Sequence, residues 1–204
     1  IALRSGVVHN LASNDESALE QIRTWLSYLP SSAWQAPNRL TDAEGERNVN
    51  ELLNIIPENP RQAYDMHDVI NVVTDTGSVF AIQPMFGQSL ITCFARLSGR
   101  PVAIVANQPQ HMAGSITVEA ADKATQFIQV ADSFHLPLIF LTDNPGVLAG
   151  SSSEKAGILR HAGRMFLAQH HATVPKIQIT LRKAYGFGST AMGMNPFDGQ
   201  TLNL

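Results

Sequence analysis

The chain has 204 residues, of which 44% are hydrophobic and 15% charged, so it is long enough to bury a sizeable core. The net charge is −3 and there is no block of about five or six like charges, which excludes the basic stretches typical of nucleic-acid or membrane-surface binding. A single cysteine, Cys93, excludes an internal disulfide. With no apolar run of transmembrane length in the sequence, we expect a cytoplasmic protein.

A helix is predicted near the start of the chain. Ser13 and Glu16 have the spacing of a capping box, in which Ser13 caps the helix and Glu16 reaches back. The stretch from Pro30 to Pro60 is polar, contains four prolines and lacks a long period, so we expect a linker and a domain boundary there. The apolar residues before Pro30 recur at helical spacing and are expected to form a buried face: Ala18, Leu19, Ile22, Trp25, Leu26 and Leu29.

From residue 65 onward, predicted strands alternate with predicted helices, which is typical of parallel α/β units. Strands are predicted over residues 79–83, 89–96, 101–106, 137–142 and 176–181, with Ser98-Gly99 joining the second to the third. Helices are predicted over residues 65–73 and 118–134 and from a Ser151–Glu154 capping box, the last burying Ile158, Leu159, Ala162, Met165 and Phe166.

Three of the predicted strands end in glycine-containing loops. These loops span residues 107–114, 143–150 and 183–190. Ligands of such folds sit outside the carboxyl ends of the strands, so we expect the functional site there. The basic pair Arg182-Lys183 precedes the third loop, and both a surface position and attraction of a phosphate or carboxylate remain open for it.

The third loop holds the motif that is most informative about function, Gly186-Phe187-Gly188-Ser189-Thr190. Glycines let the backbone pass close to a ligand and turn its N–H groups inward, which is suited to holding an oxyanion. A purely structural turn remains an alternative. The spacing also matches the dinucleotide fingerprint, but we disfavour that interpretation because four residues separate the strand from the first glycine and no acidic partner follows about 20 residues later.

Other residues with reactive side chains are expected to have structural roles. Asp143 is predicted to cap backbone amides in an Asx-type turn, and Cys93 to be a buried, inert thiol. Ser189 lacks the G-x-S-x-G elbow of a serine hydrolase. The histidines lack metal-ligand spacing and are expected to be solvated or to cap helices, in particular His111, His161, His170 and His171.

Several blocks of sequence resemble one family. They include LSYLPSS at residues 26–32, YDMHDVI at 64–70, ITCFARLSGRPVAIVANQP at 91–109, AGSITVEAADKATQFI at 113–128 and ATVPKI followed by RKAYG near residues 172–186. In this order they resemble the carboxyltransferase subunit of biotin-dependent acyl-CoA carboxylases, the propionyl-CoA carboxylase β type. The resemblance implies an α/β fold of the crotonase-like ββα superhelix class. It also implies that the sequence is a piece of a longer subunit, inactive alone.

The resemblance implies a division into domains and a biotin site. Residues 1–36 would end an amino-terminal carboxyltransferase domain, 37–60 form the linker, and 61–204 most of the carboxyl-terminal, biotin-facing domain. The backbone amides of Phe187 and Gly188 would form an oxyanion hole for the ureido carbonyl of biotin. Many relatives have Gly-Ala at these two positions, so Phe187 is a departure. The biotin pocket would also include Ala113, Gly114 and Gly186.

The resemblance further implies the substrate, mechanism and partners. CO₂ would pass from carboxybiotin to the α-carbon of propionyl-CoA or acetyl-CoA, with the freed biotin nitrogen removing the α-proton, so that no side chain acts as base. Acyl-CoA contacts are expected at Thr190, Phe86 and Gly87. The partner would be a biotinylated subunit that carries biotin and the biotin carboxylase, so no metal is expected in this chain. Dimers would assemble into a hexamer, without nucleic acid or membrane partners.

Three alternatives remain open. One is a sister carboxylase or transcarboxylase with another acyl acceptor, such as methylcrotonyl-CoA or geranyl-CoA. A second, a crotonase-type hydratase or isomerase, would need a glutamate in a site loop; Glu119 lies past the loop and Glu154 is expected to cap a helix. The third is a non-catalytic assembly subunit, which Phe187 would favour if its ring blocked the pocket.

Overall fold

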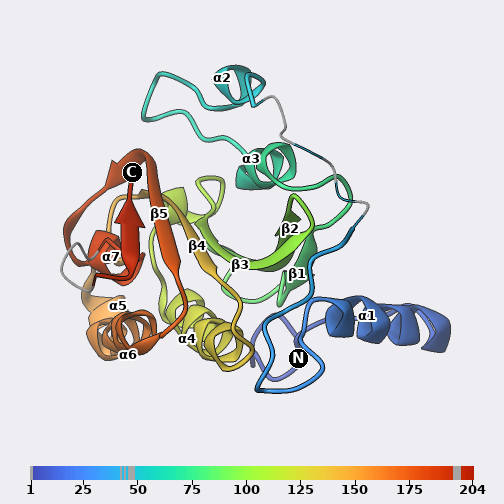
Figure 1. The fold of residues 1–204 in the computed structure, drawn as a ribbon. Helices are drawn as coiled ribbons and strands as arrows, with labels where there is room; N and C mark the ends of the chain where they lie inside the picture. The colour runs from blue at the N-terminus through green and yellow to red at the C-terminus, as the bar shows by residue number, and fades with distance from the viewer. Residues whose placement is uncertain (1, 42, 44, 46–48, 195–198) are drawn as a thin grey trace.

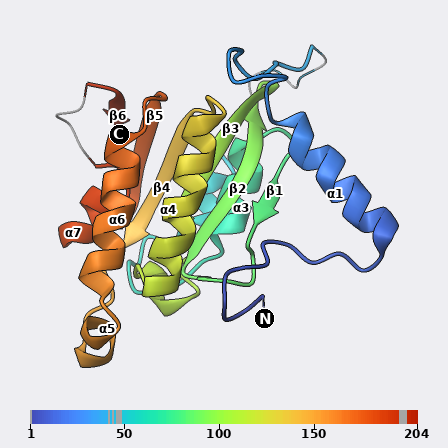
Figure 2. The ribbon, with the colours of Figure 1, turned by 90° about the horizontal axis from the view of Figure 1, so that it is seen from below.

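The computed structural model describes residues 2–41, 43, 45, 49–194 and 199–204 and contains a six-stranded sheet with helices on both faces (Figures 1 and 2). The strands lie in chain order across the sheet. They are β1 (Phe80–Ile82), β2 (Leu90–Leu97), β3 (Arg100–Asn107), β4 (Leu138–Asn144), β5 (Lys176–Ala184) and β6 (Thr201–Asn203). The helices are α1 (Asp15–Ser27), α2 (Leu52–Ile55), α3 (Met66–Val73), α4 (Val118–Ser133), α5 (Ser151–Lys155), α6 (Ile158–His171) and α7 (Gly186–Ala191), with a short 3₁₀ turn, η1 (Met112–Gly114).

The sheet is mixed, so the prediction of parallel units holds for only part of it. Strands β3 to β6 are parallel, whereas β1, β2 and β3 run antiparallel. The antiparallel part arises because β2 and β3 are joined by a two-residue connection, Ser98-Gly99, which is too short for the crossover that parallel strands need. Helices connect β3 to β4 and β4 to β5, and these strands are parallel as expected.

Each face of the sheet is covered by different helices, because successive side chains of a strand point to opposite faces. In Figure 1, α4 and α6 lie below the sheet and α3 above it. The α4 side buries Phe94, Phe127 and Phe140 together with Met165 of α6. On the α3 side, Met66 and Ile70 pack against Cys93, the thiol predicted to be buried.

Helix α1 differs from its prediction in its cap and in its burial. The cap is Asn14, whose Oδ1 accepts a hydrogen bond from the Ser17 amide at 2.8 Å, not Ser13. None of the residues of α1 is buried, and Leu19, Ile22 and Leu26 are each more than half exposed. The apolar stripe exists as predicted, but α1 extends away from the sheet (Figure 2). Of the stripe, only Trp25 and Leu29 pack against the core, next to the buried Tyr28 that follows the helix.

The helix predicted from Ser151 is two helices. Its expected caps, Ser151 and Glu154, both lie inside α5, and Gly150 precedes the helix without a side-chain cap. The chain then turns at Gly157, whose φ of 81° ends α5 and starts α6. Of the predicted buried stripe, Ile158, Ala162 and Met165 are buried and Phe166 is partly buried, but Leu159 is 65% exposed.

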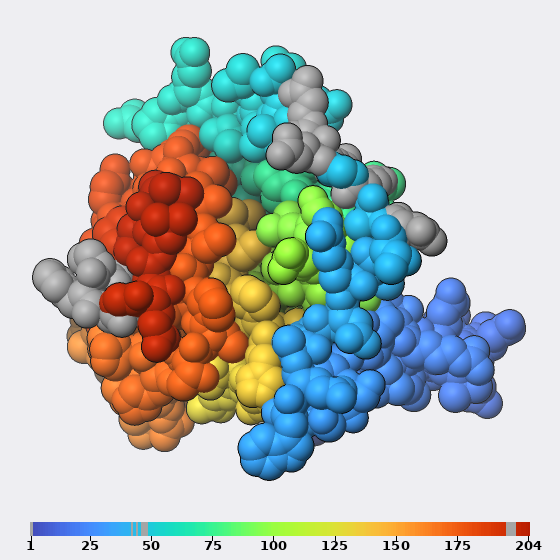
Figure 3. Space-filling view, viewed as in Figure 1, coloured from blue at the N-terminus to red at the C-terminus, as the bar shows by residue number. Residues whose placement is uncertain are grey.

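The polar stretch after α1 is partly ordered as helix α2 and lies over the α3 side of the molecule. Figure 3 shows the part around α2 lying on the α3 and β5 regions. Residues 42, 44 and 46–48 of the expected linker, and residue 1 of the segment before it, are outside the described part of the chain. Within that part, no helix has both the length and the apolar character needed to cross a membrane.

Candidate functional site

The carboxyl ends of β3, β4 and β5 lie at one edge of the sheet, because these three strands are parallel neighbours. The loops predicted from the sequence therefore meet there, although their bounds shift. Strand β4 runs to Asn144 and β5 to Ala184, so Asp143 and Lys183 belong to strands and not to loops. The third predicted loop is helix α7, which starts directly after Tyr185.

Two buried asparagines join the first two loops. The Oδ1 atom of Asn107 accepts hydrogen bonds from the Asp143 amide and from Nδ2 of Asn144, both at 3.1 Å. Nδ2 of Asn107 donates to the carbonyl of Gly114 at 3.0 Å. Oδ1 of Asn144 accepts from the Gly146 amide at 2.8 Å, which is the Asx-type turn predicted for Asp143 one residue earlier. The sequence interpretation missed both asparagines; the available signal was a polar residue ending an otherwise apolar strand.

The glycine motif forms the first turn of α7, where backbone N–H groups have no acceptor within the helix. Tyr185 precedes the helix and provides no side-chain cap. Among the hydrogen bonds described for this part of the chain, none is donated by the amides of Phe187 or Gly188. The helix dipole adds partial positive charge at the same end. These two amides, predicted as oxyanion donors, are therefore not used by secondary structure.

Gly188 is required by close packing between α7 and the second loop. A Cβ built on Gly188 would lie 2.6 Å from Oδ1 of Asn144 and 2.6 Å from Cα of Gly146. Such distances force the neighbouring backbone to shift, so any side chain at this position would displace the start of α7. Gly186 has a φ of 57° and open space around its Cβ position, so its role is conformational.

The ring of Phe187 packs against α6. Its centroid lies 6.0 Å from that of Phe166, and Phe166 in turn stacks on His170 with the centroids 5.6 Å apart. Phe187 remains 38% exposed. The departure from the usual small residue therefore adds an aromatic contact between α7 and α6.

The loop after β3 contains a left-handed turn. Met112, Ala113 and Gly114 have φ values of 50°, 54° and 79°, and for Met and Ala this conformation costs roughly 1–2 kcal/mol each. A Cβ on Gly114 would lie 2.6 Å from the carbonyl oxygen of Asp143, so this turn is pressed against the end of β4. Ala113 is exposed at the tip. Backbone strain of this kind is concentrated at functional sites.

Arg182 and Asp143 form a buried ion pair, which corrects both sequence interpretations of these residues. Nε of Arg182 donates to Oδ2 of Asp143 at 2.8 Å, and the two side chains are 8% and 0% exposed. Lys183 is 3.6 Å from the other carboxylate oxygen. Arg182 is thus neither a surface residue nor free for a phosphate. Burial, with the neighbouring Asp143 carboxylate, raises the pKa of the Tyr64 phenol, over whose ring the Arg182 guanidinium lies.

The three residues expected to contact acyl-CoA do not lie together. The carbonyl of Thr190 in α7 accepts a hydrogen bond from Nε2 of Gln169 at 3.2 Å, and α7 packs against α6 and β4. Phe86 and Gly87 lie between β1 and β2, at the other end of the strand order, where Gly87 packs against Ala120 of α4. A small acyl group cannot contact both places in one protomer.

The remaining histidines do not build a catalytic or metal site. Nδ1 of His161 is 2.6 Å from Oδ1 of Asp122, which joins α6 to α4 and replaces the expected solvated role. In the described residues no group of three or more metal-binding side chains occurs. The Ser189 hydroxyl donates to the Gly186 carbonyl at 2.7 Å and stabilises the first turn of α7.

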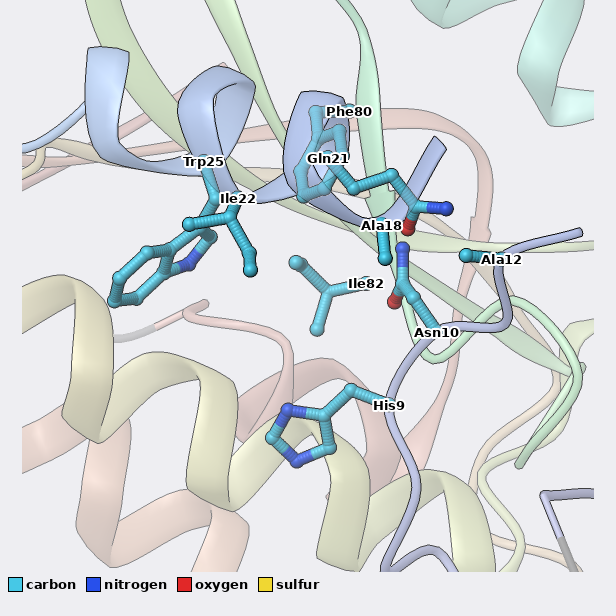
Figure 4. A pocket seen from close by; sticks show the side chains of 9 residues that line it. All are labelled: His9, Asn10, Ala12, Ala18, Gln21, Ile22, Trp25, Phe80 and Ile82. Carbon is cyan, nitrogen blue, oxygen red and sulfur yellow. The ribbon is translucent and has the colours of Figure 1, made fainter. Parts of the chain in front are cut away.

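A separate cavity of about 320 Å³ lies between α1 and β1 (Figure 4). The side chains of Ile22, Trp25, Phe80 and Ile82 make it mainly apolar, and His9 and Asn10 stand at its margin. It is on the opposite side of the strand order from α7. Because it lacks convergent polar groups, we assign it no chemistry.

The chain is similar to known proteins along almost its full length. A family model described as the carboxyl transferase domain matches residues 1–202. The propionyl-CoA carboxylase carboxyltransferase subunit of Haloferax mediterranei is 43% identical, over 89% of this chain and 36% of its own length. The methylmalonyl-CoA decarboxylase subunit alpha of Veillonella parvula is 42% identical, over 92% of this chain and 37% of its own. The chain thus spans just over a third of these relatives.

Solved structures give the same result for the fold. The transcarboxylase 12S subunit superposes with a TM-score of 0.93 at 37% identity, covering 99% of this chain and 40% of that one. This likeness confirms the crotonase-like fold predicted from the sequence. The roles predicted for the individual site residues stay predictions.

Proposed function

Because this chain belongs to the carboxyl transferase domain family, we propose that it forms the biotin-facing part of an acyl-CoA carboxyltransferase, which moves CO₂ from carboxybiotin to the α-carbon of a short acyl-CoA. The observation that carries this proposal is the pair of unpaired amides of Phe187 and Gly188 at the start of α7. Residues 61–204 would form the biotin-facing domain, 1–36 the end of the preceding domain, and 37–60 the linker. A cytoplasmic location is part of the proposal.

Two backbone features support a binding site for a flat, compact group such as the ureido ring of biotin. Gly188 and Gly114 both occupy places where a Cβ would collide with the main chain or with Asn144, so the lack of a side chain lets the start of α7 and the turn before α4 pack closely against the end of β4 and the loop after it. The asparagine network ties the loop of Gly114, through Asn107, to Asn144 at the end of β4. The left-handed turn adds Ala113 at the exposed tip. We assign Ala113, Gly114 and Gly186 to the biotin pocket.

The protein's part in the reaction is electrostatic. The amides of Phe187 and Gly188 would donate hydrogen bonds to the ureido oxygen as negative charge develops on it, which is the role of a preorganised oxyanion hole. Bound carboxybiotin supplies the CO₂ and the nitrogen that accepts the substrate α-proton. No side-chain base is needed, in agreement with the structural roles of His161 and Asp143.

Acyl-CoA and a biotinylated subunit are the proposed partners. Relatives named for propionyl-CoA carboxylase and for biotin-dependent acyl-CoA carboxylase support this choice. The transcarboxylase 12S subunit forms a hexamer assembly, which supports a dimer-built hexamer for this chain. The substrate would then contact Thr190 of one protomer and Phe86 and Gly87 of another. Alternatively, a long ligand would reach from Thr190 in α7 to Phe86 and Gly87 in the β1–β2 loop of the same protomer. Biotin and biotin carboxylase would reside on the partner, so this chain would need no metal of its own.

The test is carboxylation of propionyl-CoA by the full-length subunit that contains this chain, with a biotinylated partner, bicarbonate and ATP. Phe187→Pro removes one predicted donor, and proline is tolerated in the first turn of a helix. Loss of one donor is expected to lower kcat about 100- to 1000-fold. Phe187→Ala is the control, because it removes the ring and keeps the amide. Position 187 is preferable to 188, where any side chain would clash with Asn144.

Two outcomes decide the proposal. Equal activity of Phe187→Pro and Phe187→Ala, with both folded, would remove the oxyanion role. Absence of transfer to a panel of acyl-CoAs by the wild type would favour an assembly subunit. The contact of the Phe187 ring with Phe166 argues against that alternative, since the ring is engaged by α6. Product analysis with the same panel separates carboxylase, decarboxylase and transcarboxylase activities, which the names of relatives represent.

A further inference from the structure

The β1–β2 connection, residues 83–89, has no regular secondary structure but folds around a buried charge, the ammonium group of Lys123. Lys123 comes from α4 and is 2% exposed. Its Nζ donates to the carbonyls of Phe86 and Leu90, both at 2.6 Å, and to the carbonyl of Gln83 at 3.4 Å. A lysine ammonium has three N–H donors, so each of them has an acceptor in this connection or at its end.

No carboxylate forms an ion pair with Lys123 in the part of the chain that the structure describes. A cavity of about 70 Å³ borders Lys123, and the other titratable residues of its lining are His67 and His111, neither of which supplies negative charge. A buried charge is costly unless polar groups compensate it. The carbonyl dipoles of the connection are that compensation, so the ammonium and this fold of the connection stabilise each other.

The backbone of the connection is bent in a way that brings the carbonyls together. Gln83 and Gly87 both have a φ of 52°, a left-handed conformation that is unfavourable for a glutamine. The amides of Phe86 and Leu90 make local turn bonds, to the carbonyls of Gln83 and Gly87, at 3.1 Å each. These turns close within the connection, whereas the hydrogen bonds of Lys123 attach it to α4.

We propose that Lys123 is a positioning residue, which fixes the β1–β2 connection on α4 and thereby sets the place of Phe86 and Gly87. Helix α4 is a firm anchor, since one of its faces is buried in the core. The amide of Ile116, just before α4, also donates to the Gly146 carbonyl at 3.1 Å in the loop after β4. The consequence for substrate rests on the proposed function, in which Phe86 and Gly87 contact acyl-CoA; the fixing of the connection does not.

The variant that tests this is Lys123→Met, which keeps the length of the side chain and removes the ammonium. Its matched control is Lys176→Met, because Lys176 is 1% exposed and its Nζ also donates to a carbonyl, that of Gln169 at 2.9 Å. Hydrogen–deuterium exchange of residues 83–90, followed by mass spectrometry, reports local opening without any turnover. It is measured on the full-length subunit at about pH 6, where Lys123 is charged, since burial lowers its pKa to about 7.

Residues 83–90 should be protected from exchange in the wild type although most of them lie outside regular structure. Lys123→Met should speed their exchange about tenfold or more, the equivalent of one hydrogen bond to a charged group, and Lys176→Met should leave it unchanged. In an active protein, Lys123→Met should also raise the KM for propionyl-CoA about tenfold and keep kcat. The reason is that a displaced contact surface weakens binding of the substrate and of the transition state alike.

Each outcome decides the proposal. Equal exchange of residues 83–90 in the wild type and Lys123→Met overturns it, and so does an equal rise in Lys176→Met, which would indicate a general loss of stability. Wild-type exchange at the rate of an unprotected peptide overturns it even if Lys123→Met does not fold. Faster exchange with an unchanged KM overturns the positioning of substrate contacts. Faster exchange in a subunit that transfers no carboxyl group supports the fixing of the connection and overturns the proposed function alone.

Discussion

Nε of Arg182 lies 2.8 Å from Oδ2 of Asp143, and this buried pair connects three separate parts of the chain. Nη1 of Arg182 donates to the carbonyls of Asn59 and Gln62 at 3.0 and 2.9 Å, which ties the segment before α3 to β5. The Asp143 amide donates to Asn107 at the end of β3. These contacts therefore fix the polar segment before α3 to the carboxyl ends of β3, β4 and β5, where the candidate site lies.

Replacing Arg182 with methionine should destabilise the protein by up to about 3–5 kcal/mol, because the buried Asp143 carboxylate would lose its hydrogen-bonded cation and keep only Lys183, 3.6 Å away. The double variant Arg182→Met/Asp143→Asn should be less destabilised than the sum of the two single variants. Urea unfolding of the four proteins measures this coupling. Additive effects would show that the two side chains act independently.

The sequence predicted the strands of this sheet better than it predicted the polar contacts. Short apolar runs located β2, β3 and β4, because burial of a strand on both faces leaves a local pattern in the sequence. The contact between Arg182 and Asp143 joins residues 39 positions apart and leaves no such pattern. Three-dimensional packing alone also explains why Asn144, not Asp143, makes the turn to Gly146.

The backbone conformations of the loops were harder to predict than the positions of the strands and helices. The glycines at 186 and 188 indicated a turn, and the structure makes them the first turn of α7 because the following residues, Ser189 to Ala191, can continue a helix. At Met112 and Ala113 the left-handed conformation is imposed by neighbours, since neither side chain prefers it. The resemblance supplied the biotin-loop assignment for Ala113, which local propensity does not give.

Gly114→Ala should be more destabilising than Gly77→Ala. Both glycines have positive φ, 79° and 68°, so both variants carry the roughly 1–2 kcal/mol of a left-handed alanine. Only at Gly114 does the new Cβ meet a backbone atom, the Asp143 carbonyl oxygen at 2.6 Å, whereas Gly77 has open space. A further cost of about 1–3 kcal/mol is expected from this overlap.

Thermal or urea unfolding of the two variants gives the comparison directly. In an active protein, Gly114→Ala should also raise the KM for the biotinylated partner, because the turn beside Asn107 would move, while Gly77→Ala should not. Equal stability of the two variants would mean that the loop relaxes freely and is not pressed against β4.

The stability of the protein should rise with pH above about 7 because of Lys123. Burial lowers the pKa of this side chain to about 7 from 10.5, and its Nζ donates to the carbonyls of Phe86 and Leu90, both at 2.6 Å. Between pH 7 and 10.5 the unfolded chain binds a proton that the folded chain has released, so the free energy of unfolding increases with pH, by at most about 1.4 kcal/mol per pH unit. Below pH 7 both states are protonated and this contribution is constant.

Lys123→Met tests this origin of the pH dependence. The variant should lose the slope above pH 7 that the wild type shows, measured by urea unfolding at a series of pH values. Because the three carbonyl oxygens near Nζ, which include that of Gln83, favour the charged amine, the measured slope should fall below the upper value. An identical slope in wild type and Lys123→Met would assign the dependence to other groups.

Thr190→Ile should change the preference between propionyl-CoA and acetyl-CoA if Thr190 lines the acyl pocket. The contact of Thr190 with Gln169 uses its main-chain carbonyl, so the substitution keeps the contact and the fold. The added bulk should disfavour the longer acyl group, and one methylene in an apolar pocket is worth roughly 10-fold or more in kcat/KM. Thr190→Val is the control because it keeps the shape of threonine and should leave the preference nearly unchanged. An unaltered propionyl-to-acetyl ratio in Thr190→Ile would place the acyl group elsewhere, next to Phe86 and Gly87 at the far end of the strand order.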